Sequence, residues 1–151
     1  SAGAITRLVN MGIEPFLVTS STIAILAQRL VRRLCPECKR VAEADAEIVR
    51  ELGTKAVEVL GQDLYEAVGC PKCQERGYFG RTGIFELLPM TPQIQELTLT
   101  GTDSNVIKRE ARKSGVRSLR DDGTRKVLDG TTTIEEVLRG TRDEFLEEVI
   151  D

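Results

Sequence analysis

The chain has 151 residues, of which 40% are apolar and 30% are charged, so it is too apolar for a disordered tail and long enough for one compact domain or two small ones. Its net charge of -3 argues against a protein that binds nucleic acid mainly by neutralising phosphates. No apolar run approaches the ~18 to 20 residues that cross a bilayer, and the first residues lack the order of a signal peptide. We therefore expect a soluble protein with no transmembrane segment.

The first part of the sequence predicts two helices. Apolar residues recur at helical spacing over residues 2–11, and Gly12 follows where a helix commonly ends. Because the residue before a proline avoids the helical conformation, residues 14–18 are expected to be extended. A long second helix is then predicted as far as Leu34. Its apolar face would comprise Ile23, Leu26, Ala27, Leu30, Val31 and Leu34, and its polar face Gln28, Arg29, Arg32 and Arg33.

The middle of the sequence is acidic and then rich in glycine. The stretch from Val41 to Gly69 combines carboxylates with helical apolar spacing and predicts one or two short helices. After the last cysteine, glycines separate short apolar runs, which favours two strands joined by a tight turn. The glycines are Gly77, Gly80 and Gly83.

The last part of the sequence returns to helical periodicity and predicts a small helical bundle. Three helices are expected, over Gln93–Thr100, Ser104–Ser114 and Leu119–Asp129. Thr133 and Glu136 have the spacing of a capping box and predict one more short helix. Beyond it, apolar residues alternate with acidic ones in a tail at residues 141–151.

All four cysteines of the chain belong to two C-x-x-C pairs, Cys35–Cys38 and Cys70–Cys73. Two such turns supply the four thiolates that zinc prefers in tetrahedral sites, and a closed shell of this kind is structural because no position is open to a substrate. Lys39, Arg40 and Lys72 lie where they can offset the negative charge of the site. Two alternatives remain: reduced thiols without metal, and disulfides or a redox centre, which would require an oxidising compartment or a single C-x-x-C motif.

Arg81 is a candidate phosphate-binding residue. It lies between glycines in a Gly-Arg-Thr-Gly segment, and the planar guanidinium of arginine suits phosphate recognition. The alternative is a glycine-rich turn with a solvated arginine. Because the chain has no G-x-x-x-x-G-K-[ST] motif, it cannot form a complete nucleotide site unaided.

Several stretches together resemble the secretion ATPases of type II secretion and type IV pilus assembly machines. The first stretches are Gly3–Leu8, Met11–Leu17 and Ala27–Pro36. The others are Gly69–Cys73, Gly77–Leu88 and Leu119–Gly123. The amino-acid sequences of the first two stretches and of Arg81–Gly83 are more similar to the type II secretion ATPase, the E protein, than to the pilus assembly ATPase.

The resemblance implies a parent that is a hexameric P-loop ATPase of the cytoplasm, bound peripherally at the inner membrane through platform proteins. That parent would bind ATP and Mg²⁺ and drive pseudopilus assembly for protein export. Walker A, Walker B and the histidine box are missing here, and the chain begins with Ser1, so we expect a fragment with no ATPase activity of its own. Of the family's nucleotide-contacting groups, only Arg81 carries over.

The resemblance also implies an α+β fold: the terminal part of a RecA-like core, with an inserted tetracysteine zinc-binding subdomain and a C-terminal helical subdomain. The segments that the resemblance implies are 1–34 for the end of the core, 35–76 for the metal-binding subdomain, 77–90 for the return strands, 91–140 for the helical subdomain and 141–151 for the acidic tail. Two other functions remain open, a part of a type IV pilus assembly ATPase and an independent zinc-stabilised protein-interaction module. A zinc domain that binds nucleic acid is disfavoured by the acidic charge balance.

Overall fold

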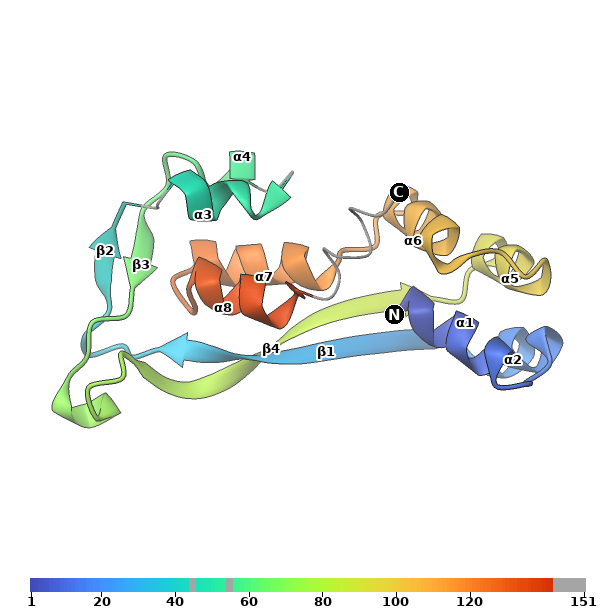
Figure 1. The fold of residues 1–151 in the computed structure, drawn as a ribbon, viewed down its shortest axis with the longest axis horizontal. Helices are drawn as coiled ribbons and strands as arrows, with labels where there is room; N and C mark the ends of the chain where they lie inside the picture. The colour runs from blue at the N-terminus through green and yellow to red at the C-terminus, as the bar shows by residue number, and fades with distance from the viewer. Residues whose placement is uncertain (44–45, 54–55, 143–151) are drawn as a thin grey trace. The chain divides into compact units, whose positions relative to one another are not determined.

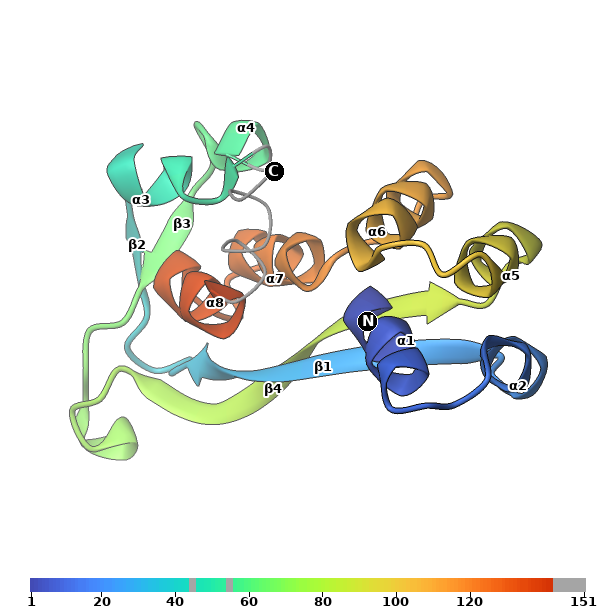
Figure 2. The same cartoon turned by 45° about the vertical axis from the view of Figure 1, so that its right-hand side comes forward.

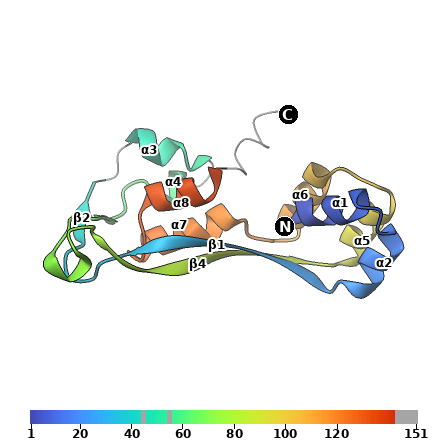
Figure 3. The same cartoon turned by 60° about the horizontal axis from the view of Figure 1, so that its bottom comes forward.

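The computed structural model describes residues 1–43, 46–53 and 56–142 and divides into two compact units. The first unit combines Ser1–Ala27 with Phe85–Ser118, and the second combines Gln28–Ile84 with the chain from Leu119 onward. Two long strands, β1 (Ala24–Leu34) and β4 (Tyr78–Pro89), pair with each other, and each begins in one unit and ends in the other (Figures 1 and 3). Helices and sheets thus mix as an α+β fold requires.

The first unit is built on four helices around one apolar core. The helices are α1 (Ala2–Asn10), α2 (Pro15–Ser21), α5 (Pro92–Leu99) and α6 (Ser104–Lys113). Side chains from α1, α2, α5, α6 and β4 form the core, which comprises Ala2, Ile5, Val18, Leu88, Ile94, Ile107 and Ala111. Helices α1, α5 and α6 confirm the sequence-based expectation for these segments.

The extended segment expected at residues 14–18 is wrong, because α2 begins there. Glu14 does have extended backbone angles, φ -55° and ψ 128°, as the residue before a proline should. Pro15 itself takes the first helical position, where its fixed φ suits a helix and its missing N–H costs nothing. The proline starts the helix and does not exclude it.

The long helix predicted as far as Leu34 is also wrong, because residues 24–34 form strand β1. The residues of the expected apolar face separate accordingly: Val31 and Leu34 are buried, whereas Ile23 is 90% exposed. Pairing with β4 supplies the hydrogen-bond partners that a helix would have found within its own segment. Tertiary pairing overrides a helical pattern here.

The hairpin expected after the last cysteine is a third correction. Residues 78–89 form one continuous strand, β4, whose partner is β1. Gly80, within β4, has a left-handed φ of 76°. Gly77, the residue before β4, packs so closely against Ala67 that a Cβ on Gly77 would lie 2.6 Å from the Cβ of the alanine. The glycines therefore serve close approach and local bending, not a tight turn.

Within the described residues, the second unit contains the four cysteines, two short strands and four helices. Figure 2 shows how these strands and helices are arranged. Its remaining elements are β2 (Arg40–Ala42), α3 (Ala46–Arg50), α4 (Ala56–Val59), β3 (Leu64–Glu66), the 3-10 turn η2 (Pro71–Cys73), α7 (Leu119–Leu128) and α8 (Ile134–Gly140). Strands β2 and β3 are antiparallel, with Val41 opposite Tyr65. The acidic helices are confirmed by α3 and α4, while the strands that flank them were not expected.

Helices α7 and α8 pack closely in the core of the second unit. A Cβ on Gly123 would lie 2.5 Å from Cγ1 of Val137, so only glycine permits this approach. The core comprises Val49, Leu52, Val59, Leu64, Val127, Ile134 and Val137. Thr133 caps α8 by accepting a hydrogen bond from the N–H of Glu136, as the sequence predicted.

The division of the chain into an ATPase-core segment, a metal-binding subdomain, return strands, a helical subdomain and an acidic tail stays a prediction. The predicted helical subdomain spans helices of both units, with α5 and α6 in the first and α7 and α8 in the second. Residues 143–151, which include most of the expected acidic tail, lie outside the described residues.

Candidate metal centre

The structure brings the four cysteines of the second unit together at one point. The Sγ atoms of Cys35, Cys38, Cys70 and Cys73 all lie within 4.8 Å of one another. Three of the separations are 3.8 Å for Cys35 and Cys70, 3.9 Å for Cys38 and Cys73, and 3.7 Å for Cys70 and Cys73. Zinc–sulfur bonds of ~2.3 Å in a tetrahedron place the sulfurs about 3.8 Å apart. The cluster therefore has the dimensions of a four-thiolate zinc site.

Each cysteine pair lies on a tight turn next to one of the long strands. The first pair follows β1 directly, and the N–H groups of Cys38 and Lys39 both donate to the carbonyl of Cys35. The second pair borders η2, and its turn leads through two left-handed residues, Gln74 and Glu75, toward β4. Local backbone hydrogen bonds thus direct both thiols of each pair toward the same centre.

The backbone also donates hydrogen bonds to sulfur. The N–H groups of Cys70 and Gly77 each lie 3.2 Å from Sγ of Cys73. Burial opposes ionisation of Cys73, but these N–H groups outweigh it and lower the pKa of the thiol to about 7. Burial raises the pKa of the Cys38 thiol to about 12. A divalent cation would supply the positive charge that holds all four sulfurs as thiolates.

Three nearby cations have specific partners in the structure. Lys72 Nζ lies 2.7 Å from the carboxylate of Glu37, which joins the middle of one cysteine pair to the middle of the other. Arg40 binds Glu66 across the β2–β3 ladder. Lys39 donates to a backbone carbonyl 2.8 Å away. Their side chains therefore join parts of the second unit in addition to placing positive charge near the sulfurs.

The corner between α7 and α8 is attached to the segments that flank the first cysteine pair. The N–H of Leu34 donates to the carbonyl of Thr131 at 2.8 Å, and Lys39 Nζ donates to the carbonyl of Gly130. The Lys39 ammonium also lies 4.4 Å from the centre of the Tyr65 ring. A Cβ on Gly130 would lie 2.7 Å from this ring, so glycine is required. The metal centre and the helical corner are thus parts of one packed structure.

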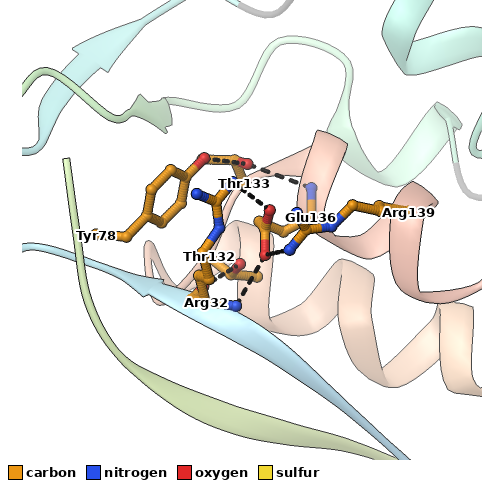
Figure 4. Close-up of polar contacts among 6 residues, drawn as sticks. All are labelled: Arg32, Tyr78, Thr132, Thr133, Glu136 and Arg139. Carbon is orange, nitrogen blue, oxygen red and sulfur yellow. Dashed lines mark hydrogen bonds and ion pairs between the residues drawn. The ribbon is translucent and has the colours of Figure 1, made fainter. Parts of the chain in front are cut away.

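A second polar cluster surrounds the buried carboxylate of Glu136 on α8 (Figure 4). It accepts hydrogen bonds from the backbone N–H of Arg32 at 2.9 Å, from the Arg32 guanidinium at 2.7 Å and from Arg139 at 2.7 Å. Burial alone would raise the pKa of Glu136, but the hydrogen bonds and charge of Arg32, with the charge of Arg139, outweigh it and lower the pKa. The Arg32 guanidinium also lies 4.0 Å from the centre of the Tyr78 ring.

The sequence did not predict this cluster. Arg32 was placed on the solvated face of a helix, whereas it lies on β1 and its partner is 104 residues away. The spacing of a capping box was the one sequence signal that singled out Glu136, although it predicted a different contact for this residue. In such a box the glutamate reaches back to the backbone of the capping residue. Here its carboxylate binds the two arginines and the backbone of β1 instead.

Arg81, the candidate phosphate-binding residue, is exposed on β4, directly after the left-handed Gly80. It does not belong to the cysteine cluster. Within the described residues, no hydrogen bond or ion pair involves its guanidinium. The side chain is therefore available to bind an anion, although nothing in its surroundings specifies one.

Across the described residues, no helix is both long enough and apolar enough to cross a membrane.

The family model for type II/IV secretion system proteins matches residues 1–139. The chain therefore belongs to this family. It is 51% identical over 142 residues to the type II secretion system protein E of Pseudomonas aeruginosa, and 48% identical over 143 residues to the type II secretion system ATPase E of Vibrio cholerae. It is also 47% identical over 140 residues to the type IV pilus assembly ATPase PilB of Myxococcus xanthus.

These alignments cover most of this chain and a small part of each relative. They include 94%, 95% and 92% of the chain, respectively, but only 28%, 28% and 25% of the corresponding relatives. The chain thus spans about a quarter of the length of the curated relatives it matches. The family resemblance seen in the sequence motifs is confirmed.

Proposed function

We propose that this chain is the C-terminal, zinc-binding portion of a cytoplasmic ATPase that powers type II protein secretion by driving pseudopilus assembly. The parent would act as a hexamer, bound peripherally to platform proteins of the inner membrane. The observation that carries the proposal is the cluster of four sulfurs within 4.8 Å in a chain of the secretion family. The residues that hold zinc are Cys35, Cys38, Cys70 and Cys73.

The zinc has a structural role. Four cysteine ligands complete its shell and leave no position for water or substrate, so the ion cannot act as a Lewis acid on a bound molecule. Its effect is to fix the two cysteine turns and, through Leu34 and Lys39, the corner between α7 and α8. A rigid lobe can transmit the movement of a motor to a partner, whereas a loose one would absorb it.

The chemistry of ATP hydrolysis belongs to other parts of the parent. ATP and Mg²⁺ require a phosphate-binding loop of the Walker A type, which this sequence does not contain. Arg81 is the residue of this chain that we assign to nucleotide, as a contact for a phosphate group. Its exposure on β4 and the suitability of guanidinium for phosphate support the assignment.

A type IV pilus assembly ATPase is the second candidate. It is favoured by the 47% identity to the pilus assembly ATPase of Myxococcus xanthus, which is close to the values for the type II secretion relatives. The two functions differ in what the machine assembles and not in the metal centre.

One experiment separates these candidates. In the source organism, the chromosomal copy is changed to carry Cys35→Ser together with Cys73→Ser, and export of a folded protein and surface piliation are measured in the same cells. The proposal predicts that export is lost while piliation persists. Loss of piliation with normal export would assign the chain to pilus assembly. Normal export and normal piliation, with the altered protein present at its usual level, would refute both functions.

A further inference from the structure

Helix α6 and the turn after it carry the densest group of positive charges in the chain. Residues 108–117 contain five cationic side chains and one carboxylate, although the whole chain has a net charge of -3. Four of the five cations are exposed, and we call them the basic surface of the first unit. They are Arg109, Arg112, Lys113 and Arg117.

Packing of α6 directs its basic surface away from the core of the first unit. Ile107 and Ala111 are the buried residues of the helix and belong to that core. Arg109, Arg112 and Lys113 are spaced i, i+3 and i+4, so they share one helix face, and this face is opposite to the buried one. The fold therefore presents these three cations together.

Two of the four charges have no partner within the described residues, and a third has a weak one. No hydrogen bond or ion pair involves Arg109 or Arg117 in that part of the chain. Lys113 Nζ lies 3.3 Å from Glu110, but the lysine side chain is 75% exposed, so this pair contributes little. The negative end of the helix dipole favours cations in the last turn, such as Arg112 and Lys113, but Arg109 precedes that turn and Arg117 follows the helix. The surface keeps a positive charge that an acidic partner can neutralise.

The most acidic nine-residue window of the sequence is the tail, residues 143–151. It contains five carboxylates and no cation. The carboxylates are Asp143, Glu144, Glu147, Glu148 and Asp151. From Glu144 onward their spacing is i, i+3, i+4 and i+7, and the cations of α6 repeat the first steps of this spacing. The two segments are thus complementary in charge and in spacing.

We infer that the basic surface of α6 is a docking site for the acidic tail of a second copy of this chain, with Arg109, Lys113 and Arg117 as the residues that bind its carboxylates. Charge complementarity carries the choice of occupant. The inference deepens the proposed function, on which it rests because a hexamer places copies side by side. Each contact between exposed charges is weak, but the same contacts repeated around a ring act together.

Nucleic acids and anionic membranes are the other partners that a basic surface can bind. Both present long arrays of phosphates, which would also approach the rest of the chain. Residues 108–117 contribute a net charge of +4, which leaves -7 on the other 141 residues, so an extended anion meets repulsion beyond the basic surface. A short acidic segment contacts this surface alone and is favoured for that reason.

The test uses the full chain loaded with zinc, as an equal mixture of isotope-labelled and unlabelled protein. A carbodiimide joins a lysine to a carboxylate that it contacts, and mass spectrometry of the digest distinguishes links between copies from links within one copy. The expected product joins Lys113 of one copy to Glu147 or Glu148 of another. The link between Lys113 and Glu110 of the same copy reports that the reaction has worked.

Charge reversal on the basic surface gives the expected loss. Arg109→Glu with Arg117→Glu should lower the yield of links between copies at least about fivefold, because two attractions become repulsions. The matched control is Arg29→Glu with Arg33→Glu, which makes the same change at two exposed positions of β1 in the second unit. This control should change the yield by less than about twofold.

A mixture of two variants distinguishes a second copy from the same copy. Glu144→Lys with Glu147→Lys and Glu148→Lys changes the tail and should by itself lower the yield at least about fivefold. Mixed with Arg109→Glu, Arg117→Glu, this tail variant supplies an intact surface and the other chain supplies an intact tail. Links between the two chains should therefore return in the mixture.

The inference is overturned if Lys113 is joined to the tail only within one copy, if the β1 control lowers the yield as much as the surface variant does, or if the mixture recovers no links. It is also overturned if a DNA duplex or phosphatidylglycerol vesicles bind in a way that requires Arg109 and Arg117 while no links between copies form, because the surface would then serve another anion. Zinc content and protein export are measured separately, so failure of tail docking is distinguishable from failure of the proposed function.

Discussion

Replacement of Glu136 by glutamine tests whether the polar cluster on α8 stabilises the second unit. The carboxylate is 2% exposed and accepts three hydrogen bonds, two of them from the guanidinium groups of Arg32 and Arg139. Glutamine keeps the shape, but it loses the charge and turns an N–H₂ group toward positively charged donors. Hydrogen bonds to charged groups contribute ~1.5 to 3 kcal/mol each, and the Arg32 side chain is 42% exposed, which reduces its share. We expect Glu136→Gln to lower the free energy of unfolding by about 2 to 3 kcal/mol at pH 7.

The assay is urea unfolding followed by circular dichroism, with Glu135→Gln as the matched control. Glu135 precedes Glu136 on the same helix and is exposed, so its replacement should change the free energy of unfolding by less than about 0.5 kcal/mol. The folded-state pKa of Glu136 is lowered, so its stabilisation is present above the unfolded pKa and is lost as pH falls through the folded pKa. The difference between Glu136→Gln and the parent should therefore shrink in acid. Equal stability of the two glutamine variants at pH 7 would refute this account of the cluster.

Three further predictions concern the packing of α7, the helical corner and β4. Gly123→Ala should lower the free energy of unfolding by about 1 to 3 kcal/mol, because the added methyl overlaps Val137; thermal unfolding measures this, and an unchanged midpoint would contradict the close packing. Lys39→Met should lower the free energy of unfolding by about 1 to 2 kcal/mol, because the hydrogen bond to the carbonyl of Gly130 and the contact with the Tyr65 ring are lost. The zinc content, measured by mass spectrometry, should not change. A loss of zinc would show that the lysine acts on the metal centre instead. If the proposed function holds, Arg81→Ala in the full-length protein should lower ATP turnover without changing zinc content, and unchanged turnover would refute the proposed contact of this residue with nucleotide.

The cysteine cluster could be predicted from the sequence because its information is local. Two cysteines three residues apart can face one centre whatever the rest of the fold does, and the count of four matches the coordination of zinc. Helices α6, α7 and α8 could be predicted for a similar reason. Each has a start or stop signal within a few residues of its end, such as Gly115 after α6 and Thr133 before α8.

The strands β1 and β4 could not be predicted in the same way. Their pairing joins segments about 50 residues apart in the sequence. The apolar pattern within residues 24–34 fits a helix with one apolar face as well as it fits a strand, so the pattern alone does not distinguish the two. The contact between Arg32 and Glu136 depends on that pairing, because Arg32 reaches Glu136 from strand β1 and the sequence had predicted a helix for this segment. Strands β2 and β3 have only three residues each, too few for a periodic pattern. Long-range contacts thus account for most of what the sequence alone left out.

The central claim is that the four cysteines hold one zinc ion and that the ion keeps the second unit folded. The most direct measurement is the metal content of the purified full chain, by native mass spectrometry, together with its thermal unfolding before and after treatment with a strong chelator. The account predicts one zinc ion per chain, its loss in Cys35→Ser with Cys73→Ser, and a large decrease in thermal stability when the metal is removed, since structural zinc binding contributes directly to folding free energy. A chain that contains no metal, or one whose helical signal and unfolding temperature do not change on chelation, would contradict it.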